Sequence, residues 1–399
     1  MESTKDKPRR KKPPPQNPIE ATITTWFRTN RHMQQTQSSF DELVAQSPRR
    51  WTVYEPMVLL PAGSFETAAW KQLLPCLPSD DADALWVQIL AEISKKSGGA
   101  LLTHLAVNEG IPAAHHRTLS QYGDEDDVSK ENTLRSPTGL RILHGDFGPA
   151  SGVSDDFENA FWVSTRQNGV FQTWAPRWTM FSRGNIKEKA RLLDFHNGRE
   201  TEDKTTMEDS WAVDLYAGIG YFTFSYAKLG MRVLCWELNP WSVEGLRRGA
   251  LGNGWSVRVV KGADLVLTMK DLVGDGERII VFLEDNRHAA QRMEELSGLN
   301  ILHVNCGLLP TSDGSWKDAW SIVAMSESPE AWLHLHENVG AADIKKRGEE
   351  IEQYFIDLAR EDDRQRRAYV DHTELVKTFA PGVWHCVFDL CITRFSGII

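Results

Sequence analysis

The segment at residues 214–220, Asp-Leu-Tyr-Ala-Gly-Ile-Gly, constrains the fold of this chain more than any other. It ends an apolar run at residues 211–215 and precedes a helix-like stretch at residues 221–229, which predicts a strand, a glycine turn and a helix. Gly218 and Gly220 allow a ligand to approach the backbone closely, and the first N–H groups of a helix attract an anion. We therefore expect a carboxylate or phosphate at this turn. The alternative is a turn that needs glycine for its geometry alone.

An acidic residue follows the next predicted strand. Residues 231–236 are strand-like and end at Glu237, about twenty residues beyond the glycine turn, where an acidic side chain can bind the two hydroxyls of a ribose. Dinucleotide sites usually contain a third glycine in the loop, whereas residues 221–224 here are Tyr-Phe-Thr-Phe. The pattern favours S-adenosylmethionine over a dinucleotide. The competing interpretation is that Glu237 only caps a helix.

Strand-like and helix-like runs alternate from residue 211 onward, which indicates a doubly wound, mostly parallel α/β sheet. Two late runs flank the turn at residues 380–382 and predict an antiparallel C-terminal edge. Besides the first two strands, the predicted elements are residues 241–251, 279–283, 288–296, 301–304, 332–336, 343–358, 375–379 and 383–392.

The Asn168-Gly169 dipeptide predicts a tight hairpin at residues 161–174, because both residues tolerate the positive φ angles of its turn. This hairpin opens a predicted catalytic domain at residues 161–399, whose Rossmann-like core spans residues 211–395.

Residues 1–160 are predicted to form a tail and a smaller domain. Residues 1–18 are basic, rich in proline and without hydrophobic periodicity, so we expect a disordered tail. Residues 19–160 are expected to form an α+β domain with an acidic loop at residues 123–132. Its predicted helices are residues 19–45 and 84–94, and its short strands are residues 51–60, 101–107 and 140–143.

The composition argues against membrane and disulfide-rich classes. No apolar run approaches the roughly 18 residues of a membrane helix, and charges and prolines stand where a signal peptide would be apolar. The scattered cysteines include no C-x-x-C pair, so neither a disulfide framework nor a zinc site is predicted. We expect a cytoplasmic protein without metal. The cysteines are Cys76, Cys235, Cys306, Cys386 and Cys391.

A formal net charge of −10 restricts nucleic-acid binding to local basic patches. One patch is the tail, which we interpret as a solvated segment. The other is the better candidate because Trp174 and Trp178, which can stack on a base, are interleaved with its cations. Those cations are Arg166, Arg177, Arg183, Lys187, Lys189 and Arg191.

Several motifs resemble the tRNA wybutosine-synthesizing protein 2 family, and especially its fungal members. The longest is Trp-Ala-Pro-Arg-Trp-Thr-Met-Phe-Ser-Arg-Gly-Asn-Ile at residues 174–186. The resemblance covers about residues 50–395. The other motifs lie at residues 188–191, 214–220, 235–240, 284–287, 305–310, 334–339 and 380–385.

The resemblance implies a class I methyltransferase-like fold and a transferase. Members of the family move the 3-amino-3-carboxypropyl group of S-adenosylmethionine to 4-demethylwyosine, the base that follows the anticodon in tRNA(Phe), during wybutosine biosynthesis. The partner implied is therefore the anticodon stem-loop of tRNA(Phe). Carried over to matching positions, the donor ligands are Ser182, Lys189, Glu237, Asp285 and Asn286, beside Asp214, Gly218 and Gly220 of the turn.

The chemistry of these side chains agrees with such roles. Lys189 can neutralise the methionine carboxylate, Ser182 can donate to it, and Asp285 with Asn286 can hydrogen-bond adenosine. The alternative is that Lys189 is a solvated helix charge and Ser182 a helix cap. Asp264 competes with Asp285, and we prefer Asp285 because the strand before it is stronger.

Two other activities remain open. Related enzymes methylate guanine N1 of tRNA, and a non-catalytic binding module would keep the fold but lose the cofactor residues. The longer motif at residues 305–310 favours aminocarboxypropyl transfer, in which positioning decides which carbon of the sulfonium reacts. No residue is assigned as a catalytic base, although Glu284 and Asp285 are candidate proton acceptors. His334 and His336 with Glu337 could be a metal site, but we interpret residues 334–338 as pocket wall or RNA contact.

Overall fold

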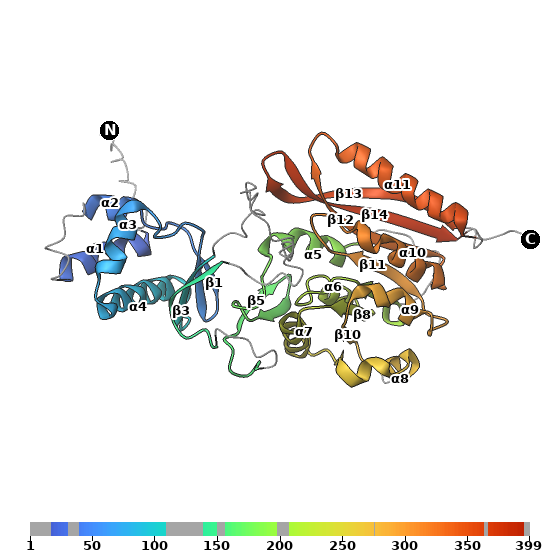
Figure 1. Cartoon of the computed structure of the whole chain (residues 1–399), viewed down its shortest axis with the longest axis horizontal. Coiled ribbons are helices and arrows are strands. Elements are labelled where there is room, and N and C mark those ends of the chain that lie inside the picture. Colours follow the sequence, from blue (N-terminus) through green and yellow to red (C-terminus); the bar gives the residue numbers. More distant parts are fainter. Residues whose placement is uncertain are drawn as a thin grey trace, which may run out of the picture. The chain divides into compact units, whose positions relative to one another are not determined.

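The computed structural model describes residues 17–30, 40–108, 139–149, 156–197, 207–274, 276–362 and 366–394. Residues 1–16 of the predicted tail and the predicted acidic loop at residues 123–132 lie outside these ranges. The described residues form two compact units, one ending at Gly148 and the other comprising the rest of the chain (Figure 1).

The first unit is a small α+β domain. Its four-stranded sheet has the order β1-β2-β3-β4, with a parallel β2–β3 pair between two antiparallel pairs. The strands are β1 (Thr52–Tyr54), β2 (Met57–Leu60), β3 (His104–Asn108) and β4 (Leu140–His144). The helices are α1 (Pro18–Thr29), α2 (Phe40–Ala45), α3 (Ala68–Leu73) and α4 (Ser79–Lys96), with a 3-10 turn η2 (Leu74–Cys76).

Helix α1 begins slightly earlier than the sequence suggested. Asn17 Oδ1 accepts hydrogen bonds from the N–H groups of Ile19, at 2.9 Å, and Glu20, at 3.5 Å, and Pro18 occupies the first helical turn. Residues 17 and 18 therefore belong to this ordered domain and not to the tail. The cap explains the difference, because hydrophobic periodicity does not report capping residues.

The second unit contains an eight-stranded sheet with the order β13-β14-β12-β11-β7-β8-β10-β9. Strands β12, β11, β7, β8, β10 and β9 are parallel, and β14 and β13 add an antiparallel edge. The α/β class, the parallel core and the antiparallel C-terminal edge are thus confirmed. The strands are β7 (Trp211–Asp214), β8 (Arg232–Glu237), β9 (Val257–Val260), β10 (Ile279–Leu283), β11 (Ile301–Cys306), β12 (Glu330–Gly340), β13 (Arg366–Ala380) and β14 (Val383–Arg394).

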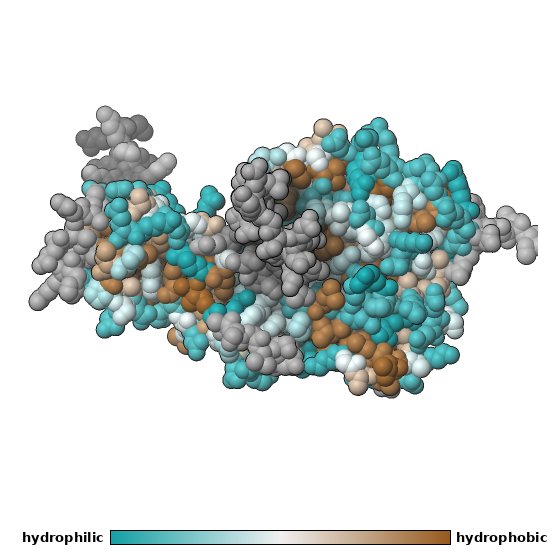
Figure 2. All heavy atoms as spheres, viewed as in Figure 1, coloured by the Kyte–Doolittle hydropathy of each residue, from teal (hydrophilic) through white to brown (hydrophobic). Residues whose placement is uncertain are grey.

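Helices cover both faces of this sheet, so its central strands are buried on both sides. In β8, Leu234 and Trp236 face one core, and Val233 and Cys235 face the other. The first core includes residues of α8 (Met269–Val273), α9 (Ala289–Met293), α10 (Trp316–Met325) and α11 (Ile344–Glu361). The second includes residues of α5 (Ile186–Leu193), α6 (Thr223–Lys228) and α7 (Pro240–Gly252). Figure 1 shows α11 beside β13 and β14, and its outer face is hydrophilic in Figure 2.

Short 3-10 turns join several of these elements. They are η3 (Arg183–Asn185), η4 (Met207–Asp209), η5 (Gly262–Val266), η6 (Asn286–His288) and η7 (Asp313–Ser315). In the part of the chain that the structure describes, no helix combines the length and the apolar character that crossing a membrane requires.

The predicted hairpin is present as β5 (Val163–Gln167) and β6 (Val170–Trp174). Asn168 and Gly169 have φ angles of +51° and +73°, as the turn requires. The residues just before it also pack with the second unit, since Phe157 contacts Trp241 edge to face. The second unit therefore includes residues that the sequence analysis placed in the first domain.

Phe388 of β14 tests the packing of the C-terminal edge. Its side chain is fully buried, so Phe388→Ala should lower the free energy of unfolding by about 3–5 kcal/mol through lost burial and the cavity it leaves. Phe379→Ala on neighbouring β13 is the matched control, because Phe379 is 61% exposed and its loss should cost about 0.5 kcal/mol or less. Urea unfolding measures both, and equal losses would contradict the described packing.

Candidate functional site

The glycine turn between β7 and α6 has the backbone that glycine permits. Gly218 and Gly220 have φ angles of +54° and +87°. A Cβ atom at Gly220 would lie 2.5 Å from the ring of Phe224, and one at Gly218 would lie 2.8 Å from the ring of Tyr221. Both glycines are therefore required by the turn itself, whatever binds there.

Asp214, at the end of β7, holds this turn in shape. The carboxylate is fully buried and accepts hydrogen bonds from Tyr216 N–H, Thr223 N–H, Thr223 Oγ1 and Asn305 Nδ2 at 2.8–3.2 Å. Burial raises the pKa of the Asp214 carboxyl, and these hydrogen bonds oppose that shift by stabilising the ionised form. One N–H group at the start of α6 is therefore already hydrogen-bonded within the protein and is not available to a ligand. The geometry makes Asp214 a residue that shapes the site.

Glu237 ends β8 beside the turn, as the spacing predicted. Its Oε2 accepts from Gly218 N–H at 2.8 Å, and its Oε1 accepts from Asn239 N–H at 2.8 Å. The helix cap of α7 is Asn239, whose Oδ1 accepts from Trp241 N–H at 2.9 Å, so Glu237 is not that cap. The carboxylate is half-buried at the carboxyl edge of the sheet, where it can accept from two ribose hydroxyls.

The sheet order favours Asp285 over Asp264 as the next group. Strand β10 pairs with β8, and Leu283 lies opposite Glu237, so Asp285 follows close to that carboxylate. Strand β9 is the outer neighbour of β10, and Asp264 in η5 is exposed. Asn286 lies close to the turn, because its Nδ2 donates to Leu215 O at 2.8 Å.

The two candidate proton acceptors are occupied by arginines. Glu284 accepts from Arg292 through both oxygens, at 2.6 and 2.8 Å, and Asp285 pairs with Arg287 at 2.9 Å. Burial alone would raise the pKa of Asp285, but the hydrogen bonds and charge of Arg287 outweigh it, and the pKa is lowered. The geometry therefore favours neither carboxylate as a base.

Ser182 is tied to the glycine turn through Tyr221. The Ser182 N–H donates to the Tyr221 hydroxyl at 3.1 Å, and that hydroxyl donates to Met180 O. Ser182 occupies the N-cap position of η3, but its hydroxyl makes no capping hydrogen bond there. Its Oγ instead donates to Asn185 Oδ1 at 3.2 Å.

Lys189 of α5 is buried and not a solvated helix charge. The side chain is 4% exposed, and its ammonium donates to Gln167 Oε1 at 2.9 Å and Gln172 Oε1 at 2.6 Å. The ammonium also lies 5.2 Å from the centre of the Phe181 ring and 5.3 Å from that of Tyr221. Burial lowers the pKa of Lys189 to about 7.

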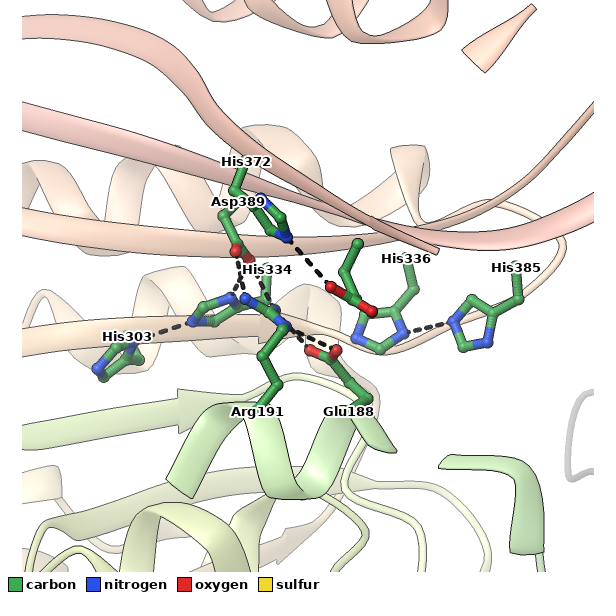
Figure 3. Close-up of polar contacts among 9 residues, drawn as sticks. Glu188, Arg191, His303, His334, His336, His372, His385 and Asp389 are labelled. Atoms are coloured by element: carbon green, nitrogen blue, oxygen red, sulfur yellow. Dashed lines mark hydrogen bonds and ion pairs between the residues drawn. The ribbon is translucent and has the colours of Figure 1, made fainter. Parts of the chain in front are cut away.

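A buried polar network joins α5 to the C-terminal strands (Figure 3). Arg191 donates to both oxygens of Glu188 and both oxygens of Asp389, and both carboxylates are fully buried. Burial would raise the pKa of Asp389, but the hydrogen bonds and charges of His334 and Arg191 outweigh it, and the pKa is lowered. Because Lys189 lies between Glu188 and Arg191 in the chain, the network also fixes its position.

The network continues through three histidines. His334 Nδ1 lies 2.7 Å from Asp389, His334 Nε2 lies 2.9 Å from His303, and His303 lies 2.8 Å from His196. Local sequence patterns do not predict this arrangement, because its members come from four separate segments of the chain.

His336 forms a second histidine pair, with His385 at 2.9 Å. Burial lowers the pKa of both rings, to about 4 for His385, so the pair is uncharged at neutral pH. Of the two alternatives for residues 334–338, RNA contact is wrong for His334 and His336, because both are at most 1% exposed. Among the described residues, no group of three or more His, Cys, Asp or Glu side chains is arranged to hold a metal ion.

Only some of the side chains of the predicted basic patch are exposed. Arg166, Arg183 and Lys187 are exposed, whereas Lys189 is buried and Arg191 is paired with carboxylates. Trp174 is 3% exposed and stacks on Phe181 at 4.3 Å, so it is not free to stack on a base. Trp178 stacks on Trp241 at 5.2 Å.

Gly220→Ala tests the turn. The new methyl group would meet the buried Phe224 ring in addition to requiring a positive φ, and overpacking of this kind costs about 1–3 kcal/mol. Gly254→Ala is the control, because Gly254 also has a positive φ of +79° but no atom within 4 Å of the new Cβ. Urea unfolding should show the larger loss for Gly220→Ala, and equal losses would contradict the clash.

The lowered pKa of Lys189 predicts that the stability of the protein depends on pH. The pKa of Lys189 in the folded protein, about 7, lies below that of an unfolded lysine. At pH values between the two pKa values, the unfolded state therefore binds more protons than the folded state. As a result, Lys189 destabilises the fold less as pH rises through this range. The free energy of unfolding of the natural protein, minus that of Lys189→Met, should therefore increase from pH 7 to pH 10. Denaturant titrations across this range measure it, and a constant difference would mean that Lys189 has an ordinary pKa.

Comparison with known proteins identifies the family. The chain is 40% identical over 347 residues to tRNA wybutosine-synthesizing protein 2 of Schizosaccharomyces pombe, covering 86% of this chain and 72% of the relative. It is 33% identical over 393 residues to the protein of the same name from Saccharomyces cerevisiae, covering 87% of this chain and 75% of the relative. No protein-family model matches the chain.

Solved structures support the fold. The TYW2 protein of P. horikoshii in complex with MeSAdo has a TM-score of 0.55 at 18% identity, covering 94% of this chain and 99% of that one. Trm5b from Pyrococcus abyssi has a TM-score of 0.51 at 12% identity, covering 88% of this chain and 78% of that one. At these identities both are similar in fold alone. The sequence identities to the two yeast proteins show more: this chain belongs to the tRNA wybutosine-synthesizing protein 2 family.

Proposed function

We propose that this chain transfers the 3-amino-3-carboxypropyl group of S-adenosylmethionine to 4-demethylwyosine in tRNA(Phe), a step of wybutosine biosynthesis. Membership of the wybutosine-synthesizing family carries the proposal. Guanine-N1 methylation is not favoured, because the relatives with high identity over most of the chain carry the wybutosine name. The non-catalytic alternative predicted loss of the donor residues, whereas Gly218, Gly220 and Glu237 are present and adjacent.

The residues at the carboxyl edge of the sheet fit the donor. Glu237 offers carboxylate oxygens to a ribose, and Asp285 with Asn286 lies beside it for adenosine. On the other side of the turn, Lys189 and Ser182 supply positive charge and a hydroxyl for the amino-acid part. The donor supplies a sulfonium whose carbon substituents are electrophilic. The chain's residues bind and orient it, and this orientation decides which carbon reaches the acceptor.

The acceptor is the modified base that follows the anticodon, presented by the anticodon stem-loop of tRNA(Phe). Exposed Arg166, Arg183 and Lys187 lie in segments flanking Ser182 and are suited to contact RNA phosphates. Phosphate contacts of this kind weaken as salt concentration rises. We place the reaction in the cytoplasm and without a metal ion.

A product assay tests the proposal. Purified protein is incubated with S-adenosylmethionine and tRNA(Phe) that carries 4-demethylwyosine, and nucleosides and the spent donor are analysed by mass spectrometry. Aminocarboxypropyl transfer releases 5′-methylthioadenosine, whereas methylation releases S-adenosylhomocysteine. The expected products are the aminocarboxypropyl nucleoside and methylthioadenosine. Formation of S-adenosylhomocysteine, or no product with a donor that binds, would refute the proposed transfer.

Glu237→Gln tests the ribose contact. Losing the negative charge should weaken both S-adenosylmethionine and 5′-methylthioadenosine about tenfold or more, because both contain the ribose and a hydrogen bond to a charged group is worth about 1.5–3 kcal/mol. Calorimetry measures both affinities. Asp264→Asn is the control, and its affinities should equal those of the natural protein because Asp264 is exposed beyond β9. Donor binding that is indifferent to Glu237→Gln would remove the ribose contact from Glu237. Loss of binding in Asp264→Asn would instead favour Asp264 over Asp285 at the adenosine.

A further inference from the structure

Lys377, on the C-terminal strand β13, reaches the segment that contains Ser182. Its ammonium donates to Ser182 Oγ at 3.1 Å and to Asn185 Oδ1 at 3.4 Å. The lysine also lies against Gly184, because a Cβ atom at Gly184 would be 2.5 Å from Lys377 Cδ. This contact joins residues 195 positions apart in the chain, and no motif in the sequence pointed to it.

Within the described ranges, the hydrogen-bond partners of this ammonium include no negatively charged group. Both oxygens that accept from it are neutral, and among the described residues no carboxylate forms an ion pair with it. Its strand partner His385 is uncharged at neutral pH, and Lys377 contributes to lowering the pKa of that ring. On the same strand, Glu374 pairs with His372 at 3.1 Å and not with Lys377. A partly buried ammonium without an anion is unfavourable, and an anionic ligand would stabilise it.

The position of the ammonium relative to the glycine turn is fixed. Tyr221 follows Gly220 directly, and its hydroxyl accepts from Ser182 N–H at 3.1 Å. Ser182, whose hydroxyl accepts from Lys377, is therefore held beside the glycine turn. The same turn contacts Glu237 through Gly218 N–H. A ligand with its ribose at Glu237 and an anionic end near Ser182 would have that end next to Lys377.

Lys377 is also better placed than Lys189 for direct contact. The Lys189 ammonium is enclosed by Gln167, Gln172 and the Phe181 ring, and its side chain is 4% exposed. Lys377 is only half-buried and already donates to the Ser182 hydroxyl. Lys189 is therefore kept from direct contact by the groups that enclose it, whereas Lys377 can donate directly to an incoming oxygen.

We propose that Lys377, together with the Ser182 hydroxyl, binds the carboxylate of the amino-acid part of S-adenosylmethionine. This inference rests on the proposed function and adds a residue of the C-terminal hairpin to its donor site. The carboxylate belongs to the group that is transferred, so Lys377 holds the moving part of the donor while Glu237 holds the part that leaves. Lys377 is thus a positioning residue for the choice of the carbon that reacts.

The experiment compares two ligands that differ in the carboxylate. S-Adenosylmethionine contains it, and 5′-methylthioadenosine lacks the whole aminocarboxypropyl group. In calorimetry with the full chain, Lys377→Met should weaken S-adenosylmethionine by about tenfold to a hundredfold, the usual effect of a lost hydrogen bond to a charged group, and leave methylthioadenosine within about twofold. Ser182→Ala should show the same selectivity, and Lys377→Arg should recover part of the affinity.

Lys346→Met is the matched control, because Lys346 lies exposed on α11, its side chain 75% accessible, and should change neither affinity. Unchanged methylthioadenosine binding also shows that a variant is folded. Equal weakening of both ligands, or no weakening of either, would overturn the inference. It would also be overturned if Lys377→Met lowered only the affinity for tRNA, which would assign Lys377 to an RNA phosphate. If the natural protein binds no S-adenosylmethionine, the proposed function itself fails. If it binds and Lys377→Met matches it, only this inference fails.

Discussion

The carboxyl edge of the sheet depends on one buried carboxylate. Asp214 accepts from the loop that contains the glycines, from the first turn of α6 and from Asn305 at the end of β11. Without these hydrogen bonds, three neighbouring segments would lose a common anchor, and the position of Gly218 N–H opposite Glu237 would no longer be defined. A carboxylate fully inside the protein is tolerated because it is surrounded by donors. The ligand-facing groups are therefore ordered by a residue that need not contact the ligand.

A second set of buried polar groups attaches helix α5 to the C-terminal strands. Arg191 binds Glu188 on its own helix and Asp389 on β14, so two buried carboxyl groups share one guanidinium. Breaking such a pair leaves an uncompensated charge and typically costs about 3–5 kcal/mol, so α5 is strongly fixed against the sheet. This attachment brings Ser182 within reach of Lys377, because the same β13–β14 hairpin carries both Asp389 and that lysine.

The sequence predicted the features that depend on neighbours along the chain. The glycine turn, the acidic residue after the next strand, the Asn-Gly hairpin and the antiparallel edge are local patterns, and the structure contains all four. It did not predict the Arg191–Asp389 pair, whose members are 198 positions apart, or the burial of Lys189. A lysine in an amphipathic segment looks the same whether it faces water or two glutamines. Only the packing of α5 on the hairpin distinguishes these environments.

The arrangement separates the two ends of the proposed donor between different parts of the chain. The ribose end is assigned to Glu237, which belongs to the parallel core common to many nucleotide-binding sheets. The carboxylate end is assigned to Ser182 and Lys377, which come from the segment before the core and from the edge added after it. In this proposal the core binds the shared nucleoside, and selection of the transferred group comes from the elements that flank it. The proposal therefore makes the choice of transferred group depend on how the two flanking segments are held together, and the ion pair of the buried Arg191 with Asp389 holds them together.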